Sequence, residues 1–154
     1  MGKEAKTNAM RMLERAKIAY EAHEYPHEEG VAVDGVRVAE SMGQNPDCVF
    51  KTLVTQGADK NYYVFVIPVA ATLDLKKAAR SVGVKSVAMI HVADINKITG
   101  YVRGGCSPVG MNKQFVTRFD ESCLDKPTIF VSAGRIGTQI EASPAGLLQA
   151  SRAC

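Results

Sequence analysis

The residues best suited to chemistry lie together in one stretch, TGYVRGGCSPVG, at positions 99–110. It contains Cys106 and Ser107, and both side-chain types act as nucleophiles in enzymes. It also contains four glycines and a proline, which are typical of turns and of loops that approach a ligand closely. Three roles therefore have to be compared: a catalytic loop with its own nucleophile, a backbone cradle for a ligand, and a simple turn.

Ser107 is a poor candidate for the nucleophile of a hydrolase. The segment 105–109 half resembles the G-x-S-x-G nucleophile elbow, but Val109 stands where the elbow needs a small residue. Pro108 directly follows the serine and has no N–H, so it cannot supply the oxyanion donor that the elbow takes from that position. We therefore expect the Ser107 hydroxyl to make hydrogen bonds within the turn.

Cys106 and the histidines give no catalytic or metal site. A reactive thiolate needs a base or a positive field, and no histidine can be assigned to Cys106, although Arg103 is close in sequence. His23 and His27 are four positions apart, but Pro26 between them breaks the helix that would make them a metal pair. The loop matches no phosphate-binding motif. We expect no metal and no cofactor.

The backbone of the loop and one lysine remain as candidates. The loop glycines let N–H groups face a ligand without intervening side chains, and such amides can hold an oxyanion. Lys51 lies in the apolar segment CVFKTLV, where a lysine either reaches the rim of the fold or meets an anion in a pocket. From these residues alone, a turn and a rim lysine are the slightly favoured interpretations.

The composition describes an ordinary globular chain. Its 154 residues are enough for one domain, with 46% hydrophobic and 23% charged residues. The net charge of +3 permits contact with a few phosphates and excludes a protein that coats nucleic acid. The absence of a long apolar run or a signal core predicts a cytoplasmic protein with no membrane partner. The cysteines are scattered and predict free thiols: Cys48, Cys106, Cys123 and Cys154.

The pattern of apolar residues, caps and glycines predicts the elements that position these groups. We predict a single α/β domain, with a mixed barrel-like β-sheet flanked by helices. The last helix is expected to open at Ser143 and Pro144. The other predicted helices span 8–17, 36–43, 72–83 and 92–100, the predicted strands span 49–56, 62–69, 84–90, 114–119, 128–134 and 138–142, and 17–27 is predicted to be extended.

Four segments together resemble the YbaK family, the free-standing relatives of the editing domain inserted in bacterial prolyl-tRNA synthetases. They are the strand around Lys51 and the segments 68–87, 99–110 and 128–141, and they occur in the family's order. The resemblance runs from about Ile18 to the last helix. It implies the family's fold, a single editing domain over residues 1–154, and hydrolysis of misacylated tRNA.

The loop, together with the helix that begins LDLK, is most similar to the branch that deacylates Cys-tRNA(Pro). The resemblance assigns catalysis to Lys51, Gly104, Gly105 and Ser107. It assigns substrate contacts to Tyr25, Thr52, Gly100, Tyr101, Cys106, Pro108, Ser132 and Gly134. Four residues depart from the family's pattern and bear on substrate preference: Arg103, Cys106, Ala133 and Gln139.

A mechanism without a protein nucleophile suits these residues. The thiol of the cysteinyl group attacks its own ester, and the protein folds the substrate into the reactive geometry. Backbone amides at 104–107 bind the developing oxyanion, and Lys51 anchors the terminal adenosine. The expected partners are the acceptor end of aminoacyl-tRNA and prolyl-tRNA synthetase. The alternatives are deacylation of Ala-tRNA(Pro) by a bound water and a non-catalytic module that binds an aminoacylated or nucleotide ligand.

Overall fold

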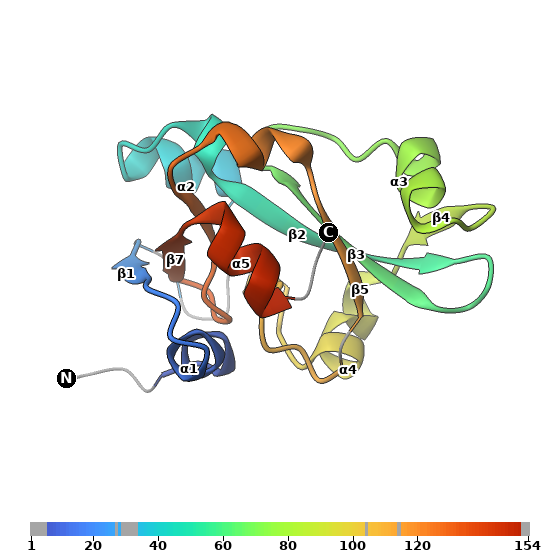
Figure 1. Ribbon diagram of the computed structural model, residues 1–154, viewed down its shortest axis with the longest axis horizontal. Coiled ribbons are helices and arrows are strands. Elements are labelled where there is room, and N and C mark those ends of the chain that lie inside the picture. The colour runs from blue at the N-terminus through green and yellow to red at the C-terminus, as the bar shows by residue number, and fades with distance from the viewer. Residues whose placement is uncertain (1–5, 27, 29–33, 104, 114, 152–154) are drawn as a thin grey trace.

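The computed structural model describes residues 6–26, 28, 34–103, 105–113 and 115–151. Within these residues the chain forms five α-helices, three short 3₁₀ helices and seven strands (Figure 1). The helices are α1 (Asn8–Arg15), α2 (Gly35–Ser41), α3 (Leu75–Val82), α4 (Ile95–Thr99) and α5 (Pro144–Ser151), with 3₁₀ helices η1 (Pro46–Cys48), η2 (Val92–Asp94) and η3 (Glu121–Asp125). The strands are β1 (Glu21–Glu24), β2 (Phe50–Gly57), β3 (Tyr62–Pro68), β4 (Val87–Met89), β5 (Val116–Phe119), β6 (Ile129–Ser132) and β7 (Thr138–Ala142).

The strands form two sheets. One is antiparallel with the order β1-β7-β6, and the other is mixed with the order β4-β2-β3-β5, in which β3 and β5 run parallel. Among the described residues, one isolated parallel bridge, between Val49 and Phe130, joins the two sheets. The predicted mixed α/β domain is confirmed, and its strands divide into two sheets that meet at this bridge.

The largest hydrophobic core lies where α1 and α5 pack against the strands of both sheets. Leu13 of α1 and Leu147 of α5 are fully buried there, beside Ile129, Val131 and Ile140 of β6 and β7. A second, smaller cluster joins α3 to β3 and β4 at the other end of the molecule (Figure 1). The first and last helices are therefore held by one core, although they are far apart in sequence.

The helix ends follow local signals in the sequence. Thr7 caps α1 by accepting a hydrogen bond from the Met10 N–H at 3.2 Å, and Asp74 caps α3. Gly83 ends α3 and Gly100 ends α4, both with a positive φ that disfavours other residues. These ends confirm the predicted helices to within a few residues. None of the described helices has the length and apolar character needed to span a membrane.

Candidate functional site

A cavity of about 900 Å³ opens between the two sheets. One wall is β2, the opposite wall is formed by the ends of β6 and β7, and the start of α2 and the segment 89–95 complete it. Five predicted site residues line this cavity: Tyr25, Lys51, Thr52, Cys106 and Ser132. Thus strands from both sheets and one loop bring together side chains that are up to 107 positions apart in the chain, from Tyr25 to Ser132.

The β2 wall of the cavity contains an open strand edge at Thr52. The Val54 carbonyl accepts a hydrogen bond from the Ile90 N–H at 3.3 Å, on the side of β2 away from β3. In an antiparallel strand, alternate residues direct N–H and C=O to the same edge, so Thr52 directs both toward the same side as Val54. β4 pairs only with residues 55–57, and the bridge to β6 is at Val49. Neither neighbour therefore pairs with Thr52.

The side chain of Thr52 adds a third polar group at this place. Its Oγ1 is buried and has no hydrogen-bond partner among the described residues. A buried hydroxyl without a partner costs free energy, so unpaired groups of this kind mark places where a ligand or water binds. Of the two side-chain oxygens of this kind among the described residues, that of Thr52 belongs to a residue of the cavity lining, which makes Thr52 a candidate polar contact.

Two cationic side chains line the cavity. Lys51 is half-buried on β2, and Arg103 is exposed on the loop that follows α4; neither side chain makes an ion pair or hydrogen bond with any described residue. The one carboxylate among the lining residues, Asp34, accepts a hydrogen bond from the Arg37 N–H as the cap of α2. The charge of the cavity therefore favours an anionic or strongly polar ligand.

The glycine-rich loop satisfies many of its own polar groups. The Tyr101 hydroxyl donates to the Val109 carbonyl at 2.7 Å, and the Tyr101 N–H donates to Thr99 Oγ1 at 3.1 Å. The Ser107 hydroxyl accepts from the Val109 N–H at 3.3 Å, and the Gly105 N–H donates to the Val102 carbonyl at 3.0 Å. These bonds fix the loop from within.

Two glycines of the family pattern make room for Tyr101. A Cβ at Gly110 would lie 2.6 Å from the Tyr101 hydroxyl oxygen, and one at Gly134 would lie 2.8 Å from its ring. Both glycines also have a positive φ, of 84° and 105°. Gly134 and Tyr101 thus pack against each other outside the cavity lining, and their part in the site is to hold the loop.

The expectation for the loop amides has to be corrected at Gly105. Its N–H is already used within the turn, so it is not a free donor for an oxyanion. The expected turn bond of Ser107 is present, and Ser107 is fully buried outside the cavity lining. Gly100 and Pro108 also lie outside the lining, and Gly104 lies outside the described residues. Of the described loop residues 105–107, Cys106 alone lines the cavity, and its amide remains as a candidate.

The comparison with known proteins decides the family. A family model described as "Aminoacyl-tRNA editing domain" matches residues 30–150. The chain belongs to this family. The resemblance found in the sequence is therefore confirmed, and with it aminoacyl-tRNA as the class of substrate.

Relatives of this editing domain support the same assignment. A protein of Enterococcus faecalis (strain ATCC 700802 / V583), named "Putative Cys-tRNA(Pro)/Cys-tRNA(Cys) deacylase EbsC", is 47% identical over 143 residues, which cover 93% of this chain and 87% of the relative. A structure described as a "putative trans-editing enzyme for prolyl tRNA synthetase" matches with a TM-score of 0.78 and 25% identity, over 95% of this chain and 88% of that one. The fold alone is shared with hypothetical protein APE2540, with a TM-score of 0.83 and 20% identity over 94% and 93% of the two chains.

Cys106 is not an activated thiol in this editing domain. Burial raises its pKa to about 11, against an ordinary value of 9.0, and a hydrogen bond with Thr99 opposes this only in part. The thiol is therefore protonated at neutral pH, and the thiolate is the nucleophilic form. The side chain forms part of the apolar wall with Val54 and Val64.

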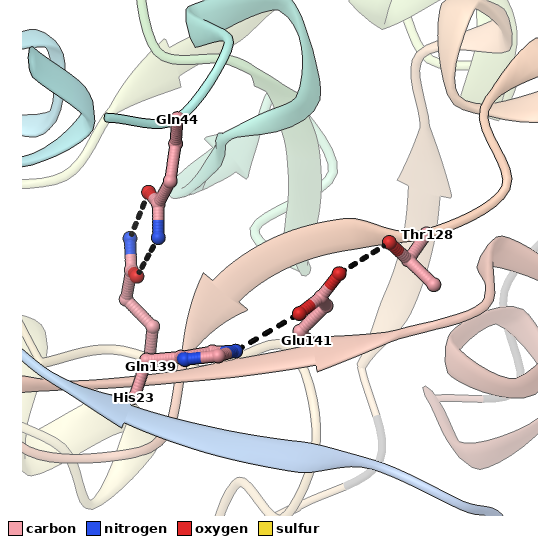
Figure 2. A network of polar contacts seen from close by, with 5 residues as sticks. All are labelled: His23, Gln44, Thr128, Gln139 and Glu141. Carbon is pink, nitrogen blue, oxygen red and sulfur yellow. Dashed lines mark hydrogen bonds and ion pairs between the residues drawn. The ribbon is translucent and has the colours of Figure 1, made fainter. Parts of the chain in front are cut away.

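Gln139 is held by a partner that the sequence did not indicate. Its amide and that of Gln44 exchange hydrogen bonds of 2.8 and 3.3 Å, which link β7 to the turn after α2 (Figure 2). Gln139 lines the cavity, and α2 supplies part of the wall. Gln44 is 95 positions away in the chain, so no local pattern could have identified this pair.

A second network in Figure 2 joins β1 to β7 and to the start of β6. His23 Nε2 lies 2.9 Å from one Glu141 oxygen, and the Thr128 hydroxyl donates to the other at 2.6 Å. These hydrogen bonds, that of Thr128 first, lower the pKa of Glu141. Glu21 completes a cluster of three groups that could hold a metal ion, with ligand atoms within 4.8 Å of one another. Because both Glu141 oxygens are engaged by the protein, we interpret the network as structural.

Proposed function

We propose that this editing domain deacylates Cys-tRNA(Pro), with the thiol of the substrate as the nucleophile. The observation that carries the proposal is the cavity itself, whose described lining has unpaired polar groups and cations and a Cys106 thiol that is not activated. The name of the relative from Enterococcus faecalis supports the choice of cysteine. A substrate that brings its own thiol needs only to be bound and oriented.

The proposed reaction balances without a cofactor. The cysteinyl sulfur attacks the ester carbonyl carbon, the bond from that carbon to the ribose oxygen breaks, and a thiolactone forms. The thiol proton passes to the departing ribose oxygen, which restores the free tRNA 3′ end. Water then opens the thiolactone to cysteine. Holding sulfur and carbonyl in contact converts the attack into a favourable intramolecular step.

The residues of the cavity have distinct roles in this proposal. Lys51 anchors an oxygen of the terminal adenosine as a point charge. Thr52 orients the aminoacyl group through its hydroxyl and its open backbone edge. The amides of residues 104 and 106 are the proposed donors to the oxyanion, since that of Gly105 is engaged and Ser107 is buried outside the lining. Tyr25 and Ser132 form the opposite wall.

Deacylation of three substrates tests the proposal. We expect fast release of cysteine from Cys-tRNA(Pro), and at least about 100-fold slower release from Ser-tRNA(Pro) and Ala-tRNA(Pro), because neither carries a thiol. Fast cleavage of the seryl or alanyl ester would show attack by water and contradict the thiol route. Binding of all three without cleavage would show a non-catalytic module.

Replacement of Cys106 by Ala separates the substrate thiol from the protein thiol. We expect the Cys106→Ala variant to retain activity within about threefold, since its thiol is protonated and forms part of an apolar wall. Loss of activity in a variant that folds normally would indicate that Cys106, and not the substrate thiol, is the nucleophile.

The proposal extends to the whole chain and its setting. Residues 1–154 act as one editing unit, because α1 lies outside the matched residues 30–150 yet packs into the main core.

We further propose that prolyl-tRNA synthetase selects the tRNA in the cytoplasm, since a net charge of +3 suits contact with the acceptor end only. Co-migration of the two proteins with tRNA(Pro) on a sizing column tests this partner.

A further inference from the structure

The mouth of the cavity carries three groups that the proposed chemistry does not use. Arg103 is exposed there, and Met89 and Val92 line the same cavity with 48% and 53% of their surface exposed. A charged donor and two exposed apolar side chains around one opening are the complement of a nucleotide, which has an anionic phosphate and an apolar base face.

Arg103 has its full hydrogen-bonding capacity available. Within the part of the chain that the structure describes, its guanidinium makes no ion pair or hydrogen bond. The one carboxylate among the described lining residues is that of Asp34, and it caps α2. A guanidinium offers five donors in a planar fork that matches the oxygens of a phosphate.

Met89 and Val92 supply the apolar part of the opening. They come from β4 and from η2, and Met89 pairs with Thr55 of β2, so this segment adjoins the end of the open edge. A polarizable thioether next to a branched aliphatic side chain can pack against the face of any base. Exposed apolar groups in a lining are more informative than single ones scattered on a surface.

The size of the cavity calls for a ligand larger than an amino acid. Its volume of about 900 Å³ is near the upper end of ordinary ligand pockets, about 300–1,000 Å³. A cysteinyl group bound at Thr52 would fill only a small part of it. The remaining space is large enough for an attached nucleotide.

We infer that this mouth binds the terminal nucleotide of the tRNA, with its 5′-phosphate on Arg103 and its base against Met89 and Val92. The inference rests on the proposed function, because that function places the reacting ester at β2. In this arrangement Lys51 contacts the ribose oxygens of the same nucleotide. Arg103 thereby becomes a substrate-binding residue that departs from the family's pattern.

Binding of adenosine 5′-monophosphate and of adenosine to the full chain tests the phosphate contact. We expect the wild-type protein to bind the monophosphate about 10-fold more tightly than adenosine, because the phosphate adds one charge-assisted hydrogen-bonded contact. Arg103→Ala should reduce this preference to about twofold or less, and Arg103→Lys should retain part of it. Arg11→Ala removes an exposed arginine on α1, away from the cavity lining, and should leave the preference unchanged.

The apolar contact has a separate signature. Met89→Ser and Val92→Ser should each weaken the binding of adenosine and of its monophosphate by the same factor, about threefold to fivefold. The ratio of the two affinities should therefore stay unaltered. A loss confined to the monophosphate would contradict the assignment of the base to this surface.

Deacylation kinetics separate the failure of this inference from the failure of the proposed function. With Cys-tRNA(Pro), Arg103→Ala should raise KM, leave kcat nearly unchanged and reduce the slope of log(kcat/KM) against log salt by about 0.7, the value for one single-strand phosphate contact. If the wild-type protein deacylates and Arg103→Ala behaves like Arg11→Ala throughout, the inference is wrong. If Arg103 governs binding of the monophosphate but no aminoacyl-tRNA is deacylated, the nucleotide site stands and the proposed function is wrong.

Discussion

The edge of β2 and the glycine-rich loop differ in how they use their polar groups. At the edge, the Thr52 hydroxyl is buried without a partner, and Lys51 has no counter-ion among the described residues. In the loop, the hydroxyls of Tyr101 and Ser107 and the N–H of Gly105 are all bonded within the loop itself. The loop attracts attention in the sequence, yet the unused binding capacity lies mostly on the strand.

The difference shows which residues of a family pattern act on the ligand and which act on the fold. Groups that have already formed hydrogen bonds within the protein contribute to stability, and groups left without partners are available to a substrate. Variants of the edge should therefore alter activity more than stability, and variants of the loop should do the reverse. Four experiments test that division, from the largest expected effect to the smallest.

Lys51→Ala should have the largest effect on activity. Loss of a charge-assisted contact with the substrate should lower kcat/KM for Cys-tRNA(Pro) about 100-fold, with little change in the thermal midpoint. Lys76→Ala removes an exposed lysine of α3 and serves as the matched control, with unchanged kinetics expected. Equal activity in the two variants would show that Lys51 does not bind the substrate and that the β2 edge is not part of the site.

Thr52→Val removes the unpartnered hydroxyl and keeps the shape of the side chain. We expect kcat/KM to fall about 10-fold, because one neutral hydrogen bond to the substrate is lost, while stability stays equal or rises. Thr52→Ser keeps the hydroxyl and should remain within about threefold of the wild-type rate. Urea unfolding beside single-turnover kinetics measures both quantities, and a stability loss without a rate change would contradict the comparison.

Tyr101→Phe tests the expectation that loop residues affect stability more than activity. The Val109 carbonyl would lose its donor in a buried place, which should lower the free energy of unfolding by about 1–3 kcal/mol. The rate measured well below the thermal midpoint should change less than in the Thr52→Val variant. A larger loss of rate than of stability would show that the tyrosine acts on the substrate.

Cys106 should have the smallest effect on activity, and its effect on stability should depend on pH only at high pH. Its folded-state pKa of about 11 lies above its ordinary value of 9.0, so the folded form holds the proton more tightly. The resulting stability is fully present below pH 9 and is lost as the pH rises through about 11. The difference in unfolding free energy between wild type and Cys106→Ala, measured from pH 8 to pH 11, should therefore shrink with rising pH.

Local features of the fold could be predicted from the sequence because their causes are local. Thr7 and Asp74 cap the helices that follow them, and Gly83 ends its helix, through contacts a few positions away. The division of the strands into two sheets depends on long-range pairing, such as the bridge of Val49 to Phe130. No sequence pattern indicates a single bridge of that kind.

The candidate site could be predicted only in part. The resemblance indicated Lys51 and Thr52, which line the cavity, but it also indicated Tyr101, which packs inside the loop. Whether a residue faces a cavity or a neighbouring glycine depends on tertiary packing. The pairing of Gln44 with Gln139 was missed for the same reason, since two amides 95 positions apart leave no local trace.

The open edge of β2 also bears on whether this protein can pair strand to strand with other chains. An unpaired strand edge is a template on which a strand of another chain can assemble, and it is a common start of aggregation. Here the edge at Thr52 lies inside a cavity walled by α2, the segment 89–95 and the ends of β6 and β7. A small ligand can enter, whereas an extended polypeptide would have to displace those walls. The fold thus leaves unpaired backbone groups open to a small ligand and shields them from other polypeptide chains.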